Sequence, residues 1–306
     1  MESPFAYAAQ VDRSCLIVGC GYTGRRLARR LQPRWRVLAT ARSDAVAATL
    51  RDAGIGVVAA DLDAAPAPAA LEQAAHGAAI AYLAPPPDAG TDDPRLAGFL
   101  RALGTAQPVV LLYMSTTGVY GDTRGEVVTE DSPLLPANDR ARRRVAAEAE
   151  AQRWCAAREV RCVVLRVPGI YGPGRLPLER LRRGEPALRP EDAGPGNRIH
   201  VEDLVTACVA ALERPVQGAF NVTDGNAAST TEFLQRTAAL AGLAGPPLVA
   251  LADAPGRISP GMLAFLRESR RVDNRRMREE LGVEPRYANL DDGIGASLAE
   301  LREASG

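Results

Sequence analysis

Three glycines near the start of the chain have the spacing that lets a phosphate group approach the protein backbone. Gly19, Gly21 and Gly24 form Gly-x-Gly-x-x-Gly, directly after an apolar run and directly before a helix-forming segment. The first glycine permits a tight turn, the second leaves room for a pyrophosphate, and the third lets helix and strand pack closely. A helix starting here offers free N–H groups to phosphates. The segment predicts a dinucleotide-binding turn that includes Tyr22 and Thr23.

The end of the second predicted strand favours a phosphorylated dinucleotide. NAD-binding proteins usually place a carboxylate about 20 positions after the glycines, where it holds the ribose hydroxyls. Here the strand ends at Arg42, and no carboxylate occurs between Trp35 and Ser43. A guanidinium suits a 2′-phosphate, which it binds through paired, charged hydrogen bonds. We therefore predict NADP(H), with NAD(H) as the alternative cofactor. A solvated surface arginine is the other interpretation of Arg42 in this arginine-rich chain.

Five segments, taken in order, resemble the extended short-chain dehydrogenase/reductase family, the NAD(P)-dependent epimerases and dehydratases. They are LIVGCGYTGRRLARRL (16–31), YMSTTGVYG (113–121), LRVPGIYGPGR (165–175), NRIHVEDL (197–204) and GAFNVTDG (218–225). The resemblance extends from about Ser14 to Tyr287. It is nearest to atypical bacterial members with Gly-Cys-Gly-Tyr-x-Gly and Ser-Thr-Gly-Val-Tyr-Gly signatures. It implies an NAD(P)-binding oxidoreductase or epimerase.

The resemblance also implies cofactor contacts at the ends of later strands. An aspartate at the position of Asp61, followed here by Leu62, contacts the adenine in the family; an ordinary loop aspartate is the alternative interpretation. The positions that correspond to the family's backbone contacts with the cofactor are Leu83, Ala84, Pro85, Pro168 and Ile170. The last two belong to the segment that meets the nicotinamide carboxamide.

The family's proton-transfer pair, Tyr-x-x-x-Lys, has no match in this chain, which contains no lysine. Aligned on Ala147 and Glu148, Arg144 stands at the lysine position and Arg140 at the tyrosine position. Their i, i+4 spacing keeps them on one helix face. Arginine stays protonated in proteins, so neither residue can cycle a proton near pH 7. Arg144 could still hydrogen-bond the cofactor ribose, whereas a solvated basic helix face is the other interpretation.

Another group would then have to supply or accept a proton. Thr116 corresponds to the family's catalytic Ser or Thr, whose hydroxyl can hydrogen-bond a substrate oxygen as its charge changes. Tyr171 and His200 are the other candidate acids, because a histidine titrates near neutrality. His200 lies in a segment similar to the family's Arg-x-x-His-Val-x-Asp signature. A satisfied structural histidine is the preferred interpretation there.

Further polar residues lie in the segments that contact substrate in the family. The predicted substrate-binding residues are Thr117, Tyr171, Arg175, Arg198 and His200. Arginines can bind a phosphate or a carboxylate through paired hydrogen bonds. Dehydratases of the family carry an Asp-Glu pair after the catalytic threonine. Thr117 and Gly118 occupy those positions here, which disfavours dehydration of sugar nucleotides.

Two hypotheses for function follow. The first is an NADP(H)-dependent oxidoreductase or epimerase that acts on a small polar substrate by hydride transfer without the usual Tyr/Lys relay. Hydride transfer needs chiefly orientation, and the proton could come from solvent or substrate, as in the reduction of an imine or a conjugated alkene. The second is a catalytically silent NADP(H)-binding redox sensor or scaffold. The family-like loops favour the enzyme. A conventional nucleotide-sugar 4-epimerase is disfavoured because it needs the missing base.

Alternating apolar runs and helical segments must position these residues. The predicted strands are 14–18, 36–40, 56–60, 79–83, 108–114 and 162–167. Such strand–helix alternation predicts an α/β fold with a doubly wound parallel Rossmann sheet. We assign residues 14–167, completed by 199–223, to the cofactor domain. The resemblance assigns 168–198 and 224–306 to a small, mostly helical substrate lobe, and residues 1–13 are predicted to be a flexible tail.

Composition narrows the class of partner. Basic and acidic residues balance at 37 each among 306 residues, so no global field attracts nucleic acid or a membrane surface. The five cysteines form no Cys-x-x-Cys pair, which indicates reduced thiols in a cytoplasmic protein. No metal site is predicted from the two histidines. We expect a small-molecule substrate as the partner, and the resemblance implies a homodimer through helices such as 140–159.

Overall fold

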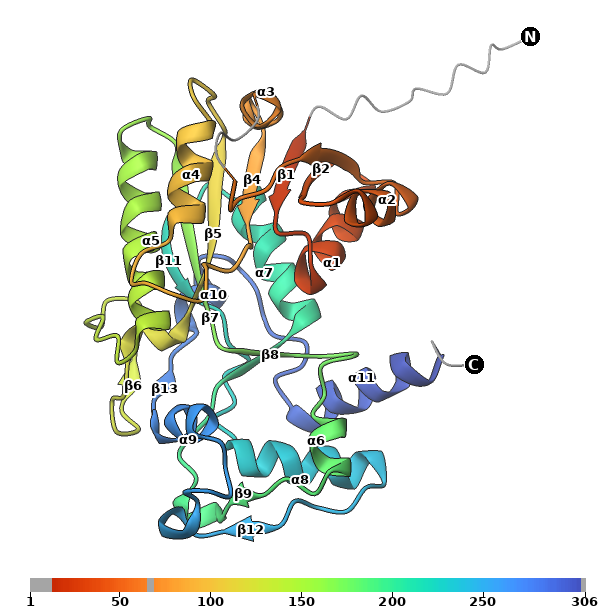
Figure 1. Cartoon of the computed structure of the whole chain (residues 1–306), viewed down its shortest axis with the longest axis vertical. Helices are drawn as coiled ribbons and strands as arrows, with labels where there is room; N and C mark the ends of the chain where they lie inside the picture. Colours follow the sequence, from red (N-terminus) through yellow and green to blue (C-terminus); the bar gives the residue numbers. More distant parts are fainter. Residues whose placement is uncertain (1–12, 65–68, 304–306) are drawn as a thin grey trace.

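The computed structural model, which describes residues 13–64 and 69–303, is built around a parallel sheet of seven strands (Figure 1). The strand order is β11-β7-β5-β4-β1-β2-β3. These strands are β1 Ser14–Val18, β2 Arg36–Ala41, β3 Gly56–Ala59, β4 Ala79–Tyr82, β5 Val110–Thr116, β7 Arg161–Val167 and β11 Gly218–Asn221. The chain runs outward from β1 in both directions, which confirms the predicted doubly wound sheet.

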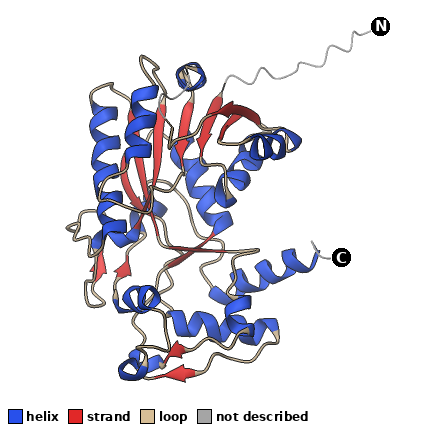
Figure 2. Ribbon diagram, in the orientation of Figure 1, coloured by secondary structure: helices blue, strands red, loops and turns tan. Residues whose placement is uncertain are grey.

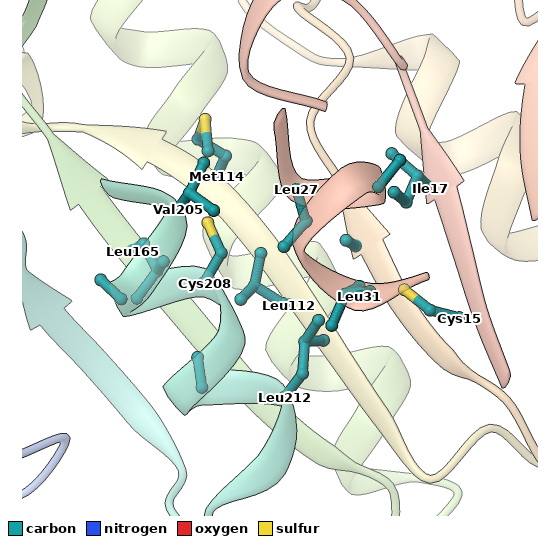
Figure 3. Close-up of a cluster of buried hydrophobic side chains, with 14 of the residues drawn as sticks. Cys15, Ile17, Leu27, Leu31, Leu112, Met114, Leu165, Val205, Cys208 and Leu212 are labelled. Atoms are coloured by element: carbon teal, nitrogen blue, oxygen red, sulfur yellow. The ribbon is translucent and has the colours of Figure 1, made fainter. Parts of the chain in front are cut away.

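Both faces of the sheet are covered because successive residues of each strand point to opposite sides. In β5, Leu111 packs into the core on one face and Leu112 into the core on the other. Figure 3 shows Leu112 with its neighbours on the second face, which include Leu27 and Leu212. Fully burying each of these side chains contributes about 1.5–3 kcal/mol relative to exposure. The near-continuous apolar runs are therefore explained by burial on two faces.

The helices form one layer on each face (Figures 1 and 2). One layer contains α1 Tyr22–Leu31, α2 Asp44–Asp52 and α7 Val201–Glu213. The other contains α3 Ala70–Ala75, α4 Pro94–Ala102 and α5 Asp139–Ala156. The helix predicted over 140–159 thus ends earlier, at Ala156. The chain turns there because Glu159 adopts a left-handed φ of 55° and the Val160 N–H bonds to the Cys155 carbonyl.

A smaller, mostly helical lobe lies at the carboxyl end of the sheet (Figure 2). Its helices are α6 Leu178–Arg182, α8 Thr230–Ala241, α9 Pro260–Arg267 and α11 Leu290–Glu303, with the 3-10 turns η2 Pro190–Asp192 and η3 Leu251–Asp253. Three short parallel pairs join its segments: β8 Gly169–Tyr171 with β10 Arg198–His200, β9 Ala187–Leu188 with β12 Leu248–Val249, and β6 Val127–Val128 with β13 Arg271–Val272. The last pair connects the lobe to the loop after β5.

One part of the predicted lobe segment 224–306 belongs to the cofactor domain instead. The helix α10 Arg275–Glu279 packs against β11. Met277, Leu281 and Val283 are buried in the core that α1 and α7 cover. The apolar side chains of this short segment pack at the β11 edge of the sheet. The order of segments along the chain does not by itself reveal that the chain returns to the cofactor domain here.

The N-terminal residues and the possibility of a membrane-spanning helix complete the description of the fold. The predicted tail, residues 1–13, lies outside the described residues except for Arg13. In the described part of the chain, no helix is both long enough and apolar enough to cross a membrane.

Candidate functional site

Two of the three glycines of the first turn, Gly19 and Gly24, occupy positions where a side chain would meet the backbone, and the third, Gly21, is open. Gly19 has a φ of 87°, and a Cβ there would lie 2.5 Å from the backbone nitrogen of Ala84. A Cβ at Gly24 would lie 3.0 Å from the carbonyl oxygen of Gly19, where α1 packs against β1. A Cβ at Gly21 would meet nothing within 4 Å. Gly21 therefore faces open space, as a residue that admits a pyrophosphate should.

The start of α1 is suited to an anion. The helix begins at Tyr22 with Gly21 as its N-cap, no side chain caps it, and its first turn contains no acidic residue. Its first N–H groups and the positive end of its dipole are thus available to a phosphate. The open face of Gly21 and this uncapped terminus together fit a dinucleotide at the turn.

The loops that follow β2 and β3 contain a charged cluster that sequence reasoning had identified only in part. Arg42 follows β2 and is exposed, and the Asp61 carboxylate accepts the Asp63 N–H at 3.0 Å. Arg95 donates to both carboxylate oxygens of Asp63, at 2.6 and 2.7 Å, and to the Pro85 carbonyl at 3.1 Å. The Arg95 hydrogen bond, aided by the charge of Arg42, lowers the pKa of Asp63. The sequence did not indicate Asp63 and Arg95 because they are 32 residues apart and belong to no motif.

Residues at the carboxyl end of β5 lie at the edge of the sheet where open α/β folds bind their ligands. Thr116 ends the strand, is half-buried, and accepts the Gly118 N–H at 3.2 Å; it caps the 3-10 turn η1 Thr117–Tyr120. The neighbouring Ser115 points to the opposite face and donates to Glu148. Thr117 is buried and lines a pocket beside Pro168.

The two arginines of α5 occupy different environments. Arg144 is half-buried and donates from one guanidinium nitrogen to the Met114 carbonyl at 2.6 Å and to the Tyr113 hydroxyl at 3.3 Å. It therefore reaches the carboxyl end of β5, with its other N–H groups left for a ligand. Arg140 is exposed at the start of the helix. Among the predicted pair, only Arg144 is directed into the protein.

His200 serves as a structural residue in this arrangement. It is buried, its Nδ1 accepts the Glu202 N–H at 3.3 Å, and its Nε2 lies 3.2 Å from the Ser297 hydroxyl. Because Ser297 donates to the Gly293 carbonyl, Nε2 is the donor to Ser297. Burial lowers the pKa of His200 to about 4, so the ring is neutral near pH 7.

Tyr171 also lies away from the pocket, in an apolar cluster of the lobe. Its ring contacts His200 and Phe233 edge-on, with centroids 5.2 and 5.7 Å away. Its hydroxyl is buried and has no hydrogen-bond partner in the described structure. Burial raises the pKa of Tyr171 well above the usual value. Neither Tyr171 nor His200 presents a readily transferred proton to the pocket.

The two arginines predicted to bind substrate, Arg198 and Arg175, lie in different environments. Arg198 is buried and donates to the carbonyls of Ala228 and Ser229, and burial lowers its pKa to about 10. It therefore ties β10 to the start of α8. Arg175 is exposed and stacks on the ring of Tyr22, with its Cζ atom 4.1 Å from the ring centroid.

The pocket beside Thr117 lies between the sheet and the lobe. Its walls are Thr117, Pro168 and Gly169, the loop 193–197, Thr230, and the segment around Phe265, Leu266, Glu268 and Arg270. It leaves about 50 Å³ for the centres of water-sized molecules. The pocket thus opens beside the end of β5 and is narrow in this structure.

The charged residues of the pocket neutralise each other. Arg270 donates to Glu268 at 3.0 Å and to the Gly121 carbonyl, and Asn138 donates to the other Glu268 oxygen at 2.9 Å. Glu268 is therefore held between an arginine and the N-cap of α5. No sequence signal identified these residues, because about 130 positions separate Asn138 from Glu268.

Comparisons with known proteins show the family to which the chain belongs. The NAD dependent epimerase/dehydratase family matches residues 15–223, and the chain belongs to that family. It is 34% identical over 180 residues to a 3-diazoavenalumate denitrifying reductase of a Streptomyces species, covering 55% of this chain and 58% of that protein. It is 31% identical over 224 residues to a UDP-glucose 4-epimerase of Mycolicibacterium smegmatis, covering 69% of this chain and 65% of that protein. The matches thus span less than two thirds of both curated relatives.

A solved structure resembles almost the whole chain. A functionally unknown conserved protein from Silicibacter pomeroyi is 34% identical, with a TM-score of 0.81, and the match covers 94% of this chain and 99% of that one. The similarity therefore includes the lobe as well as the sheet.

Proposed function

We propose that the protein is an NADP(H)-dependent oxidoreductase that transfers hydride to or from a small polar substrate without a Tyr/Lys proton relay. The observation that carries this proposal is the first turn, where Gly21 faces open space beside an uncapped helix N-terminus. Arg42 at the end of β2, with no carboxylate in that strand, favours the 2′-phosphate of NADP(H) over NAD(H).

The proposed contacts run from the phosphates of the cofactor to its nicotinamide. The turn from Gly19 to Gly24 holds the phosphates, and Arg42 binds the 2′-phosphate. Arg144, anchored on the Met114 carbonyl, offers its remaining N–H groups to the nicotinamide ribose. Thr116 hydrogen-bonds the reacting oxygen or nitrogen of the substrate, and the walls of the adjoining pocket orient it. The bound cofactor supplies or accepts the hydride.

The proton that accompanies hydride transfer must come from a group other than the family's Tyr/Lys pair. Neither Arg140 nor Arg144 carries the phenol of the usual relay, His200 and Tyr171 are buried away from the pocket, and the Glu268 carboxylate is held by Arg270. Acceptors whose reduction needs no positioned phenol, such as imines and conjugated alkenes, suit this arrangement. The Streptomyces relative, itself named a reductase, favours reduction over epimerisation.

A catalytically silent NADP(H)-binding protein is the second candidate. Two observations favour it: the absence of lysine from the chain, and the narrow pocket whose charged side chains are already paired. A homodimer formed through α4 and α5 stays a prediction under either function.

Fluorescence titration of the purified protein with NADPH and NADH tests the cofactor. We expect Arg42→Ala to weaken NADPH binding at least tenfold, about 1.4 kcal/mol, and NADH binding less than twofold. The matched control is Arg51→Ala, at the far end of α2, which should change neither affinity. Failure of the wild-type protein to bind either dinucleotide would overturn both candidate functions.

Transfer of deuterium from stereospecifically labelled NADPH distinguishes the two candidates. The protein is incubated with a panel of imines, enones and aldehydes, and the products are examined by mass spectrometry. Label in any product identifies an oxidoreductase. Tight NADPH binding with no label transferred to any member of a broad panel favours the silent protein.

A further inference from the structure

Tyr22 connects the cofactor turn to the substrate lobe. It is the first residue of α1, and its hydroxyl donates to the carbonyl of Pro173 at 2.9 Å. Its ring lies between two guanidinium groups: the Cζ atom of Arg26 is 4.3 Å from the ring centroid and that of Arg175 is 4.1 Å. The loop between β8 and α6 is thus fastened beside the dinucleotide turn (Figure 1).

The path of this loop depends on a close approach at Gly172. Its φ is 148°, and a Cβ there would lie 2.7 Å from both the Tyr22 hydroxyl and a methyl group of Val201. The N–H of Arg175 closes the turn by bonding to the Gly172 carbonyl at 2.9 Å. The backbone that carries Arg175 is therefore fixed beside Tyr22.

The two arginines on Tyr22 differ in how their charge is balanced. Arg26 forms ion pairs with Glu202 at 3.3 Å and Glu300 at 3.2 Å. Arg175 forms no ion pair within residues 13–64 and 69–303, and it is exposed. Stacking on the half-buried Tyr22 ring is a weak contact and leaves the N–H groups of the Arg175 guanidinium available. Arg175 thus places an unneutralised cation beside the helix end that favours an anion.

We propose that Arg175 binds the diphosphate of the dinucleotide, so that the substrate lobe supplies part of the cofactor site. Arg175 then serves the cofactor rather than the substrate, which differs from the role expected from its position in the sequence. The same segment of chain carries Pro168 and Gly169 in the pocket wall, so a bound dinucleotide also steadies the pocket. The inference rests on the proposed cofactor binding.

Affinity measurements with four ligands test this role without needing a substrate. NADPH, NADH and ADP-ribose contain the diphosphate, whereas adenosine 2′-monophosphate does not. We expect Arg175→Gln to weaken the first three by about five- to tenfold and equally, and to leave adenosine 2′-monophosphate unchanged. The difference should shrink in 0.5 M salt because salt screens exposed charges. Arg51→Gln is the matched control, and thermal unfolding verifies that each variant is folded.

Tyr22→Phe tests the attachment of the loop separately. It keeps the ring on which Arg175 stacks and removes only the hydrogen bond to Pro173, so a two- to fivefold loss for the diphosphate ligands is expected. Unchanged NADPH and NADH affinity in Arg175→Gln would overturn the inference and leave the proposed function intact. A loss confined to NADPH would assign Arg175 to the 2′-phosphate and would also overturn it. No dinucleotide binding by the wild-type protein would refute the proposed function itself.

Discussion

Glu148 shows how one residue of the family-like segment acts through structure. One oxygen of its carboxylate accepts hydrogen bonds from Arg166 at 2.9 and 3.2 Å, and the other accepts from Arg166 at 3.4 Å and from Ser115. The Glu148 and Arg166 side chains are only 3% and 6% exposed. Such a pair ties α5 to β5 and β7, directly beneath Thr116. The carboxylate therefore fixes the end of the strand on which the proposed site depends.

Glu148→Gln is expected to cost about 3–5 kcal/mol of unfolding free energy, because it leaves the Arg166 charge buried without its partner. Urea denaturation monitored by circular dichroism measures the loss. Glu150→Gln, on the same helix, is the control and should change stability by less than about 0.5 kcal/mol. Equal effects of the two substitutions would show that the buried pair contributes nothing specific.

At the scale of elements, the start of α5 joins the cofactor domain to the pocket. Asn138 caps the helix by accepting the Ala141 N–H at 2.9 Å, and its amide group donates to Glu268 at 2.9 Å. The same side chain thus begins the helix that carries Arg144 and holds a residue of the pocket wall. The sequence pattern predicted the helix, whereas its link to Glu268 depends on how the lobe folds back.

Substitutions at Asn138 separate these two contacts. Asn138→Ala removes both and is expected to reduce stability by about 0.5–2 kcal/mol, the usual cost of a lost N-cap. Asn138→Ser keeps the cap but is too short to reach Glu268, so most of the stability should return. Chemical denaturation of both variants provides the measurement; a serine variant as unstable as the alanine variant would indicate that the Glu268 contact, and not the cap, matters.

At the scale of the whole molecule, two buried ionisable groups lie where the sheet meets the lobe. His200 is neutral near pH 7 because burial lowers its pKa to about 4. Asp224 is buried, and burial raises its pKa to about 7. For His200 the unfolded chain binds more protons, so stability falls as pH decreases from about 6.5 to about 4. For Asp224 the folded protein binds more protons, so stability falls as pH rises from about 3.8 to about 7.

These opposite slopes largely cancel in the wild-type protein between about pH 4 and 6.5. Asp224→Asn should leave the His200 slope exposed, so that stability increases with pH across this window. His200→Asn should leave the Asp224 slope, so that stability decreases with pH. Urea unfolding at pH 5.0 and 6.5 measures both; parallel pH profiles for the two variants would contradict the assignment.

The sequence by itself determined the doubly wound sheet and the first glycine turn, because strand burial, helix periodicity and turn chemistry are local properties. The strand predicted at 14–18 matches β1. Only the tertiary structure decided which polar side chains share a pocket. Tyr171 packs in the lobe with His200 against its ring, whereas Glu268 and Arg270 line the same pocket as Thr117, about 150 positions away in the sequence. Such contacts arise from the packing of the lobe against the sheet, which no spacing along the chain encodes.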